Sequence, residues 1–395
     1  MDPLTRILSL PGDEKEARGL VHTPREIFQQ PATWRRSYEA FERAAAEVEG
    51  FLVRAGFGRA ARERPAVFLV GAGTSDYIGK SLAALLRRRW GCEARAVPST
   101  DLLTEMDDYI LPDRSYLWLS FSRSGESPEG VAVIEAALER HPRVHHFVVT
   151  CNRHGRMARE FDGLDSVFPF VLDDEVNDRG LAMTSSFSNM LVVGHCLAHV
   201  RELGAYDSLL DEMTSAARSL IPAAADAAER LAAEEFAKIC FLGTGPLKAA
   251  ATESALKVLE LTAGRVVTFA ESYLGVRHGP LSAIDGRTLA VAFLSGDTRR
   301  RAFELDLLHE IRDKRLAGRT LVVLPRPEGW KVEIGDVDPL FQTFRPDFPD
   351  YYRPAVDVVV GQLLGLFLSL RHGLKPDTPS PTGAISRVVS QIAIH

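Results

Sequence analysis

Residues 67–88, VFLVGAGTSDYIGKSLAALLRR, and residues 239–260, ICFLGTGPLKAAATESALKVLE, follow one pattern: a short apolar strand, a Gly-x-Gly turn and a helix. Gly71 and Gly243 mark the same point in the two stretches and lie 172 residues apart. The apolar stretch 116–121 is repeated with this offset at 288–293, and 146–150 is repeated about 173 residues on, at 320–324. The chain is therefore predicted to contain two copies of one α/β domain, and function is expected where the copies differ.

Short apolar stretches alternate with helical patterns from residue 65 onward, which is typical of a parallel sheet covered by helices on both faces. The predicted fold class is therefore α/β, with two three-layer αβα domains. The expected domains are an N-terminal helical arm at 1–60, a first domain at 61–215 and a second at 225–395. Further expected features are helices at 24–54, 209–235 and 356–370, an irregular Pro-rich segment at 325–354, a turn-rich loop at 376–383 and a final helix.

Composition and charge limit the kinds of molecule that the protein is expected to bind. The 395 residues carry a net charge of −6, so the chain offers no basic footprint for nucleic acid and no polybasic patch for a membrane surface, and a small molecule is the expected partner. The amino terminus is charged where a secretory signal would be apolar, and no apolar run approaches the length of a membrane span, so a cytoplasmic protein is expected. The four cysteines are isolated in the sequence, so neither a zinc site nor a disulfide framework is predicted. They are Cys92, Cys151, Cys196 and Cys240.

The first Gly-x-Gly turn invites two nucleotide-binding interpretations, and both fail. The third glycine of a dinucleotide fingerprint is replaced by Asp76, whose carboxylate would lie where a pyrophosphate belongs. The P-loop pattern that ends at Gly79-Lys80 requires a glycine where the chain has Thr74. A tight strand-to-helix turn explains both, with the hydroxyls of Thr74 and Ser75 at the helix start, where they could cap the helix or meet an anion.

A serine-rich loop follows the strand at 116–121. Residues 120–128 read SFSRSGESP, so Ser122, Ser124 and Ser127 surround one glycine at the start of a predicted helix. Hydroxyls at the positive end of a helix suit a phosphate monoester, whereas one capping serine would suffice to start the helix. We therefore expect a phosphate cradle in the first copy. The second copy has LSGD at 294–297 and has lost the cradle.

The second copy carries charge instead. Glu253, Lys257 and Glu260 fall at positions i, i+4 and i+7, which places them on one face of a helix. Such a stripe forms either a solvated face with i,i+4 ion pairs or a catalytic acid/base group, and the spacing leaves both open. His278, in the turn VRHGP at 276–280, is either a polar loop residue or a second acid/base candidate.

Two further histidines could in principle chelate a metal. His195 and His199 lie one helical turn apart in an apolar helix without a nearby carboxylate in sequence. Because a metal site needs three or four ligands, no metal site is predicted.

Taken together, these motifs resemble those of the sugar isomerase (SIS) family, most closely the tagatose-6-phosphate ketose/aldose isomerases, also described as galactosamine-6-phosphate deaminase/isomerases. A broader resemblance is to the isomerase half of glucosamine-6-phosphate synthase. The resemblance covers nearly the whole chain and rests on GAGTS at 71–75, SRSGES at 122–127, DRGLAMTSS at 178–186, ESALKVLELTAG at 253–264, RHGP at 277–280 and DTPSPTG at 377–383.

The resemblance implies roles for individual residues. Glu260 would transfer a proton between C1 and C2, with Lys257 and Glu253 as its neighbours, and His278 would open the sugar ring from the partner subunit of a homodimer. The implied phosphate and sugar ligands are Thr74, Ser75, Ser122, Arg123, Ser124, Ser127, Thr184 and Ser185. The synthase has a lysine near its carboxyl terminus, and the matching stretch 384–389, AISRVV, offers only Arg387.

The implied activity is conversion of galactosamine 6-phosphate to tagatose 6-phosphate and ammonia, without a metal or redox cofactor. No glutaminase domain or amino-terminal cysteine nucleophile precedes the first copy, so an ammonia-releasing or simply isomerising direction is expected. Two alternatives remain open: aldose/ketose isomerisation without deamination, and a non-catalytic sugar-phosphate regulator. Residues 1–64 show no basic recognition helix of the kind such regulators carry. The sequence does not distinguish a galacto from a gluco substrate.

Overall fold

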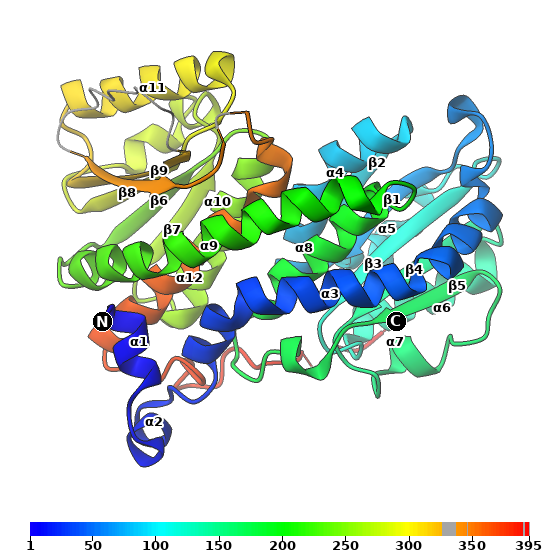
Figure 1. Ribbon diagram of the computed structural model, residues 1–395, viewed down its shortest axis with the longest axis horizontal. Helices are drawn as coiled ribbons and strands as arrows, with labels where there is room; N and C mark the ends of the chain where they lie inside the picture. Colours follow the sequence, from blue (N-terminus) through cyan, green and yellow to red (C-terminus); the bar gives the residue numbers. More distant parts are fainter. Residues whose placement is uncertain (326–336, 346, 390–391, 395) are drawn as a thin grey trace. The chain divides into compact units, whose positions relative to one another are not determined.

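The computed structural model describes residues 1–325, 337–345, 347–389 and 392–394. It divides into two compact units, each with one five-stranded sheet (Figure 1). The first-sheet unit comprises Ala32–Asp178, Ser185–Leu210 and Ile385–His395, and the second-sheet unit comprises Met1–Pro31, Arg179–Thr184 and Asp211–Ala384. The predicted domain limits remain a prediction.

Both sheets are entirely parallel, as the alternating pattern predicted. The strand orders are β2-β1-β3-β4-β5 and β10-β9-β8-β6-β7, so in each sheet the first strand of the copy lies between the next two. The first sheet consists of β1 (Ala66–Gly71), β2 (Ala94–Pro98), β3 (Tyr116–Ser122), β4 (Val144–Thr150) and β5 (Val167–Val171). The second consists of β6 (Lys238–Leu242), β7 (Val267–Glu271), β8 (Thr288–Phe293), β9 (Arg319–Pro325) and β10 (Asp338–Gln342).

Helices flank both sheets. Those that follow strands of the first sheet are α4 (Thr74–Trp90), α5 (Ser99–Tyr109), α6 (Pro128–Arg140), α7 (Arg156–Arg159) and α8 (Ser185–Ala198). Their counterparts around the second sheet are α10 (Pro246–Leu261), α11 (Thr298–Asp313) and α12 (Pro354–Arg371). The remaining helices are α1 (Pro3–Leu8), α2 (Gly12–Arg18), α3 (Thr23–Leu52) and α9 (Leu203–Ala232).

Short helical turns complete the secondary structure. They are η1 (Val53–Phe57), η2 (Ala61–Glu63), η3 (Asp174–Val176), η4 (Gly275–Arg277), η5 (Pro280–Ala283) and η6 (Asp350–Tyr352).

The Gly-x-Gly turns have the same backbone in both copies. Gly73 adopts φ 55° and ψ −125°, and Gly245 adopts φ 59° and ψ −124°, a left-handed conformation that favours glycine. A side chain on Gly71 would lie 2.5 Å from the backbone of Ser75, and one on Gly243 would lie 2.3 Å from the backbone of Leu247. The glycines are thus required by the tight strand-to-helix turn that the sequence predicted.

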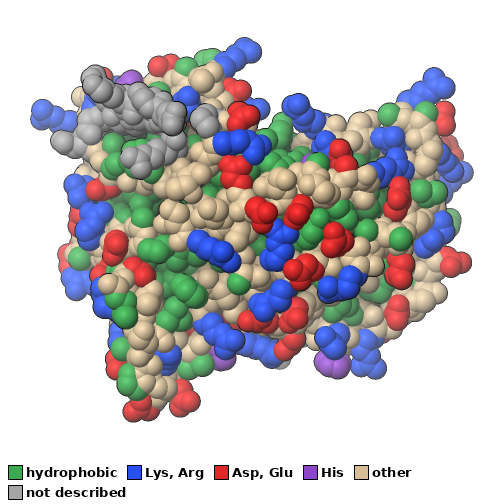
Figure 2. Space-filling view, viewed as in Figure 1, with side chains coloured by type: hydrophobic (Ala, Val, Ile, Leu, Met, Phe, Trp, Pro, Cys, Tyr) green, Lys and Arg blue, Asp and Glu red, His purple; other side chains and the backbone are tan. Residues whose placement is uncertain are grey.

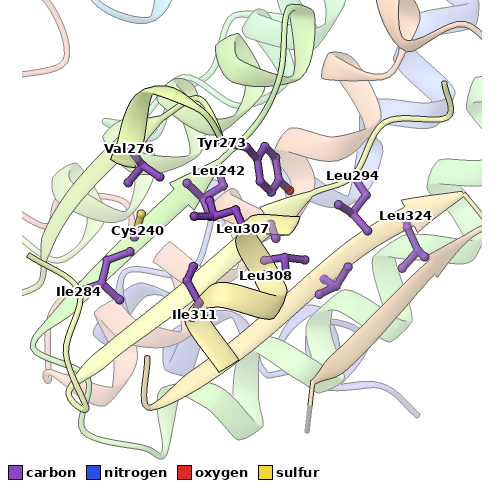
Figure 3. Close-up of a cluster of buried hydrophobic side chains, with 12 residues drawn as sticks. Cys240, Leu242, Tyr273, Val276, Ile284, Leu294, Leu307, Leu308, Ile311 and Leu324 are labelled. Carbon is purple, nitrogen blue, oxygen red and sulfur yellow. The ribbon is translucent and has the colours of Figure 1, made fainter. Parts of the chain in front are cut away.

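Apolar side chains fill the space between the second sheet and α11 (Figure 3). Leu307, Leu308 and Ile311 on α11 pack with Cys240, Leu242 and Leu324 from the strands. These side chains are at most 2% exposed, so the face of the sheet that α11 covers is a closed core.

Two segments differ from the sequence predictions. The expected final helix is wrong, because residues 384–389 and 392–394 form bends and irregular chain. The segment 325–354, expected to be irregular, contributes the edge strand β10, which pairs in parallel with β9. Residues 326–336 and 346 of that segment lie outside the described residues.

The amino-terminal end of α3 is anchored by a carboxylate from the far end of the chain. Asp377 accepts hydrogen bonds from the backbone N–H groups of Val21 (2.8 Å), His22 (3.1 Å) and Thr23 (2.8 Å). These are N–H groups that a helix start leaves without an internal partner, and a negative charge there also meets the helix dipole. The motif at 377–383 therefore begins with a structural residue.

We expect Asp377→Ala to lower the free energy of unfolding by about 1–3 kcal/mol, because several buried N–H groups lose their acceptor. Denaturant unfolding followed by circular dichroism measures the effect. Asp113→Ala serves as the control, since the Asp113 side chain is fully exposed and its loss should change stability by less than about 0.5 kcal/mol. Equal effects of the two substitutions would contradict the anchoring role.

Candidate functional site

The serine-rich loop joins β3 to α6 in the first-sheet unit. Ser122 Oγ accepts the N–H of Gly125 at 3.1 Å, and Ser124 Oγ accepts the N–H of Glu126 at 3.2 Å. Ser127 is the N-cap residue of α6 and makes no side-chain cap hydrogen bond. Each hydroxyl that accepts an N–H still has its own proton to donate. The loop is thus shaped by its serines and can present hydroxyl donors at a helix start.

The turn after β1 lies beside this loop in the sheet order, because β1 pairs directly with β3. Thr74 and Ser75 are the first residues of α4 and are 5% and 6% exposed. Asp76 follows them, almost fully buried, with its Oδ2 atom 2.7 Å from Lys80 Nζ. The carboxyl ends of neighbouring parallel strands thus bring the hydroxyls of 74–75 and of 122–127 to one edge of the sheet, where ligands of open α/β sheets bind.

Arg123 and Arg387, both expected to contact substrate, make hydrogen bonds within the first-sheet unit. The Arg123 guanidinium donates to the carbonyl of Arg387. Arg387 donates from Nε to the carbonyl of Asp178 and from Nη2 to Asn177 Oδ1, both at 2.7 Å. The two arginines therefore tie the segment 385–389 to the loops after β3 and β5.

The motif at 178–186 serves to cap a helix. Asp178, fully buried, accepts the N–H groups of Ser185 (3.0 Å) and Ser186 (2.9 Å) and the hydroxyl of Ser186 (2.6 Å) at the start of α8. Thr184 belongs to the second-sheet unit, where its carbonyl lies 3.5 Å from Gln362 Nε2. Sequence reasoning missed the capping role of Asp178, because this residue lies seven positions before Ser185 and not at the N-cap position, where such a role can be recognised.

In the second-sheet unit, α10 carries a buried ion triad: Glu253, Lys257 and Glu260. Lys257 Nζ lies 3.2 Å from Glu253 Oε1 and 2.6 Å from Glu260 Oε2. The side chains of Glu253 and Lys257 are completely buried, whereas that of Glu260 is 23% exposed. The alternative of a solvated charged face is therefore wrong, and Glu260 is the member of the triad that solvent reaches.

Close packing against α12 accounts for this burial. A side chain on Gly361 would lie 2.3 Å from Cβ of Ser254, and one on Gly365 would lie 3.0 Å from the carbonyl oxygen of Lys257. The two glycines lie one turn apart, so α12 offers a smooth stripe on which α10 rests. Glu253 and Lys257 of α10 are thereby buried, whereas Glu260 stays partly exposed.

Electrostatics keep the buried lysine charged. Burial alone lowers the pKa of Lys257, but the charges and hydrogen bonds of Glu253 and Glu260 outweigh burial and leave the pKa above the ordinary lysine value. A cation therefore stands beside the partly exposed carboxylate of Glu260 at neutral pH.

His278 follows η4 on an exposed turn of the second-sheet unit. Its backbone N–H donates to the carbonyl of Gly275 at 2.9 Å, and its imidazole makes no hydrogen bond within the described residues. The structure therefore brings Glu253, Lys257 and Glu260 together, but does not join His278 to them.

No group of three or more His, Cys, Asp or Glu side chains among the described residues could hold a metal ion. His195 Nδ1 lies 3.1 Å from the hydroxyl of Tyr206, and the ring of His199 stacks on Tyr206. These two histidines have an aromatic environment in the core, where burial lowers the pKa of His199 to about 4.

Comparison with known proteins places the chain among the sugar isomerase domains. A family model described as "SIS domain" matches residues 61–200. The chain is 39% identical to the AgaS protein of Streptomyces coelicolor, over 95% of each chain. It is 35% identical to the D-galactosamine-6-phosphate deaminase AgaS of Escherichia coli, over 94% of this chain and 95% of that protein. The chain belongs to the AgaS family of SIS-domain proteins.

Solved structures agree with this membership. The crystal structure of tagatose-6-phosphate ketose/aldose isomerase from Escherichia coli superposes with a TM-score of 0.83 at 32% identity, over 94% of this chain and 96% of that one. A more distant relative is the glutamine–fructose-6-phosphate aminotransferase of Pyrobaculum aerophilum, 26% identical over 90% of this chain and 55% of that protein. The resemblances predicted from the motifs are confirmed at both distances.

The described residues of this AgaS-family protein include one helix, α12, that is long and apolar enough to cross a membrane. The expectation that no apolar run approaches this length is therefore wrong, but 89% of the helix is buried inside the protein, as in the core helix of a folded domain.

The surface is charged with both signs. Figure 2 shows acidic and basic side chains interspersed over the face of the molecule that is in view.

We expect Lys257→Met to lower the free energy of unfolding by about 3–5 kcal/mol at neutral pH, because two carboxylates lose their buried cation. In the native protein the stabilisation from Lys257 is fully present below the ordinary lysine pKa and is lost only as the pH rises through its raised pKa. In the variant, burial should raise the pKa of Glu253, so the deficit should shrink as the pH falls from about 7.5 to about 5.

Chemical denaturation at both pH values measures this prediction. Lys314→Met, on an exposed ion pair with Glu310, should cost less than about 0.5 kcal/mol. Glu253→Gln in the Lys257→Met background should recover part of the loss, because it removes one uncompensated charge. A Lys257→Met deficit no larger than that of the control, or independent of pH, would show that the triad does not stabilise the fold.

Proposed function

We propose that this protein is a galactosamine-6-phosphate deaminase/isomerase that produces tagatose 6-phosphate and ammonia. The observation that carries the proposal is the buried triad on α10, in which the partly exposed Glu260 carboxylate lies 2.6 Å from a fully buried lysine ammonium. Support comes from the AgaS relatives, which carry the name D-galactosamine-6-phosphate deaminase and align over nearly the whole chain.

The phosphate group of the substrate would bind to the serine-rich loop. Ser122, Ser124 and Ser127 can donate hydroxyl protons at the start of α6, and Thr74 and Ser75 at the start of α4 would line the sugar. Thr184 and Ser185 are proposed as further sugar contacts from the motif match, although both are fully buried. Arg123 would hold the segment 385–389 on this loop, and Arg387 would hold it on the loop after β5.

The proposed chemistry is a proton transfer between neighbouring carbons. In the open-chain aldehyde, Glu260 would remove the C2 proton to give an enaminolate, and the same carboxylic acid would return this proton to C1. A proton then passes from the C2 nitrogen to O1. The resulting 2-imine adds water and releases ammonia, which leaves the ketose. Lys257 would stabilise negative charge that develops on oxygen, and Glu253 would hold Lys257 in place.

We expect Glu260→Gln to reduce turnover about a hundredfold or more while the protein remains folded and still binds phosphosugar, as for loss of a general base. The wild-type protein should release equal amounts of ammonia and ketose from galactosamine 6-phosphate, and should exchange a carbon-bound hydrogen with deuterium from solvent. Glu235→Gln, at an exposed position, is the matched control.

The outcomes separate the competing functions. Ketose formation from an aldose 6-phosphate without ammonia from any amino sugar would favour simple isomerisation. Saturable binding without turnover would favour a regulator. The same assays with glucosamine 6-phosphate show whether the enzyme prefers a substrate with the galacto or the gluco configuration at C4. Deuterium exchange that persists undiminished in Glu260→Gln would remove Glu260 from the mechanism.

His278 is proposed to open the sugar ring in the site of a partner subunit, so that the homodimer shares its two sites. Its exposed imidazole, without a hydrogen-bond partner among the described residues, supports such a role. Mixed dimers of Glu260→Gln and His278→Ala subunits should then regain about a quarter of wild-type activity, since random exchange makes half the dimers mixed and one site in each is intact.

The mixture is prepared by mild dissociation and reassociation, and mass spectrometry verifies the mixed dimers. Parent homodimers treated in the same way are the controls and should remain inactive. Verified mixed dimers as inactive as either parent would contradict a site composed of Glu260 and His278 from different subunits.

A further inference from the structure

The second sheet has a loop that corresponds in position to the serine-rich loop. β3 begins at Tyr116 and β8 at Thr288, which is the 172-residue offset of the duplication. The loop after β8, residues 294–297, precedes α11 as the serine-rich loop precedes α6. In the first copy, the hydroxyl groups of the loop can donate hydrogen bonds to a ligand. We therefore ask which groups accept hydrogen bonds from the corresponding loop of the second copy.

In the second copy these donors bind the carboxylate of Asp350. The hydroxyl of Ser295 donates to Asp350 Oδ2, and the N–H of Gly296 donates to Oδ1 at 3.0 Å. Asp350 is 5% exposed and comes from the short helix η6, more than fifty residues along the chain. A hydroxyl and a backbone N–H at the start of a helix are the donors that would otherwise meet a phosphate oxygen.

Two arginine side chains, one of them buried, place positive charge at the same position. Arg353 Nη1 lies 3.0 Å from Asp350 Oδ1, and Arg300 Nη1 lies 3.4 Å from Oδ2. Arg353 is completely buried, and it also donates to the carbonyl of Leu294 at 2.7 Å and pairs with Asp357 at 2.9 Å. The loop after β8 thus has the positive environment of an oxyanion site, and a side chain of the same unit supplies the oxyanion.

A second carboxylate fills the neighbouring position. Glu304 of α11 accepts the N–H of Ser295 at 2.7 Å, and the side chain of Thr244, in the Gly-x-Gly turn after β6, favours its charged form. Burial has the larger effect and raises the pKa of Glu304 to about 7. Glu304 therefore lies between the turn after β6 and the loop after β8, and Leu307 and Leu308 of the same helix fix it in the core (Figure 3).

We propose that Asp350 is a built-in substitute for a phosphate group and that, together with Glu304, it closes the ligand crevice of the second sheet. The position between these two loops is where open parallel sheets bind their ligands, and in the first copy the same two loops carry the proposed sugar and phosphate ligands. The second sheet consequently binds no phosphosugar of its own. Removal of the Asp350 carboxylate vacates a site for a small oxyanion, with Ser295, Gly296 and Arg353 as its donors.

Chemical rescue of Asp350→Ala tests this assignment. The variant should have a lower unfolding midpoint than the wild type, and sodium formate should restore at least about half of the loss in a saturable manner, as expected for a ligand that binds the native state. Inorganic phosphate should act similarly, and chloride at equal ionic strength should not. Asp347→Ala, whose side chain is 84% exposed on the same segment, is the control and should show neither the loss nor the rescue.

The measurements are repeated in a Ser122→Ala/Ser124→Ala background, so that binding to the serine-rich loop cannot account for the rescue and failure of the proposed function leaves this test intact. Rescue confined to Asp350→Ala supports the assignment. Equal anion effects on Asp350→Ala, Asp347→Ala and the wild type overturn it. If Asp350→Ala does not fold alone, refolding in formate or phosphate decides: recovery that chloride does not give supports the proposal, and no recovery overturns it.

Discussion

The contact between α10 and α12 is the constraint on which the charged site of the second sheet depends. Gly361 and Gly365 let the two helices approach so closely that no water reaches Lys257. A buried ammonium is tolerated only beside compensating charge, so Glu253 and Glu260 must occupy the same helix face. The packing of two helices thereby fixes which carboxylate remains accessible, and Glu260 is left in a defined position beside a permanent cation.

The two copies show that the same backbone arrangement can carry different kinds of side chain at the same edge of the sheet. The glycine turns after β1 and β6 agree within a few degrees, and both sheets have their first strand between the next two. The side chains at the carboxyl edges differ in kind: hydroxyls near the starts of α4 and α6 in the first copy, and internally paired carboxylates beside Ser295 in the second. The two copies thus share their strand order and glycine turns, and they differ in the polar side chains of the loops that follow the strands.

The duplicated pattern was sufficient to predict the fold class and most strands, because a period-172 repeat of strand, glycine turn and helix leaves few alternatives. The site was harder to predict from sequence. The spacing of Glu253, Lys257 and Glu260 fits a solvated face equally well, and only the glycine stripe of α12, a hundred residues later, decides for burial. Arg123 and Arg387 look like substrate ligands in isolation, but the hydrogen bonds that the structure gives them go to backbone carbonyls and to Asn177, and no motif reveals these partners.

The bond between Asp377 and the start of α3 has a consequence for synthesis of the chain. Thr23 and Asp377 lie 354 residues apart, so the carboxylate that satisfies the first N–H groups of α3 is made long after the helix itself. At ribosomal rates of about 5–20 residues per second, the start of this helix waits roughly 20–70 s for its cap. The amino-terminal helix can form early, but its docking must wait until the segment that contains Asp377 has been made.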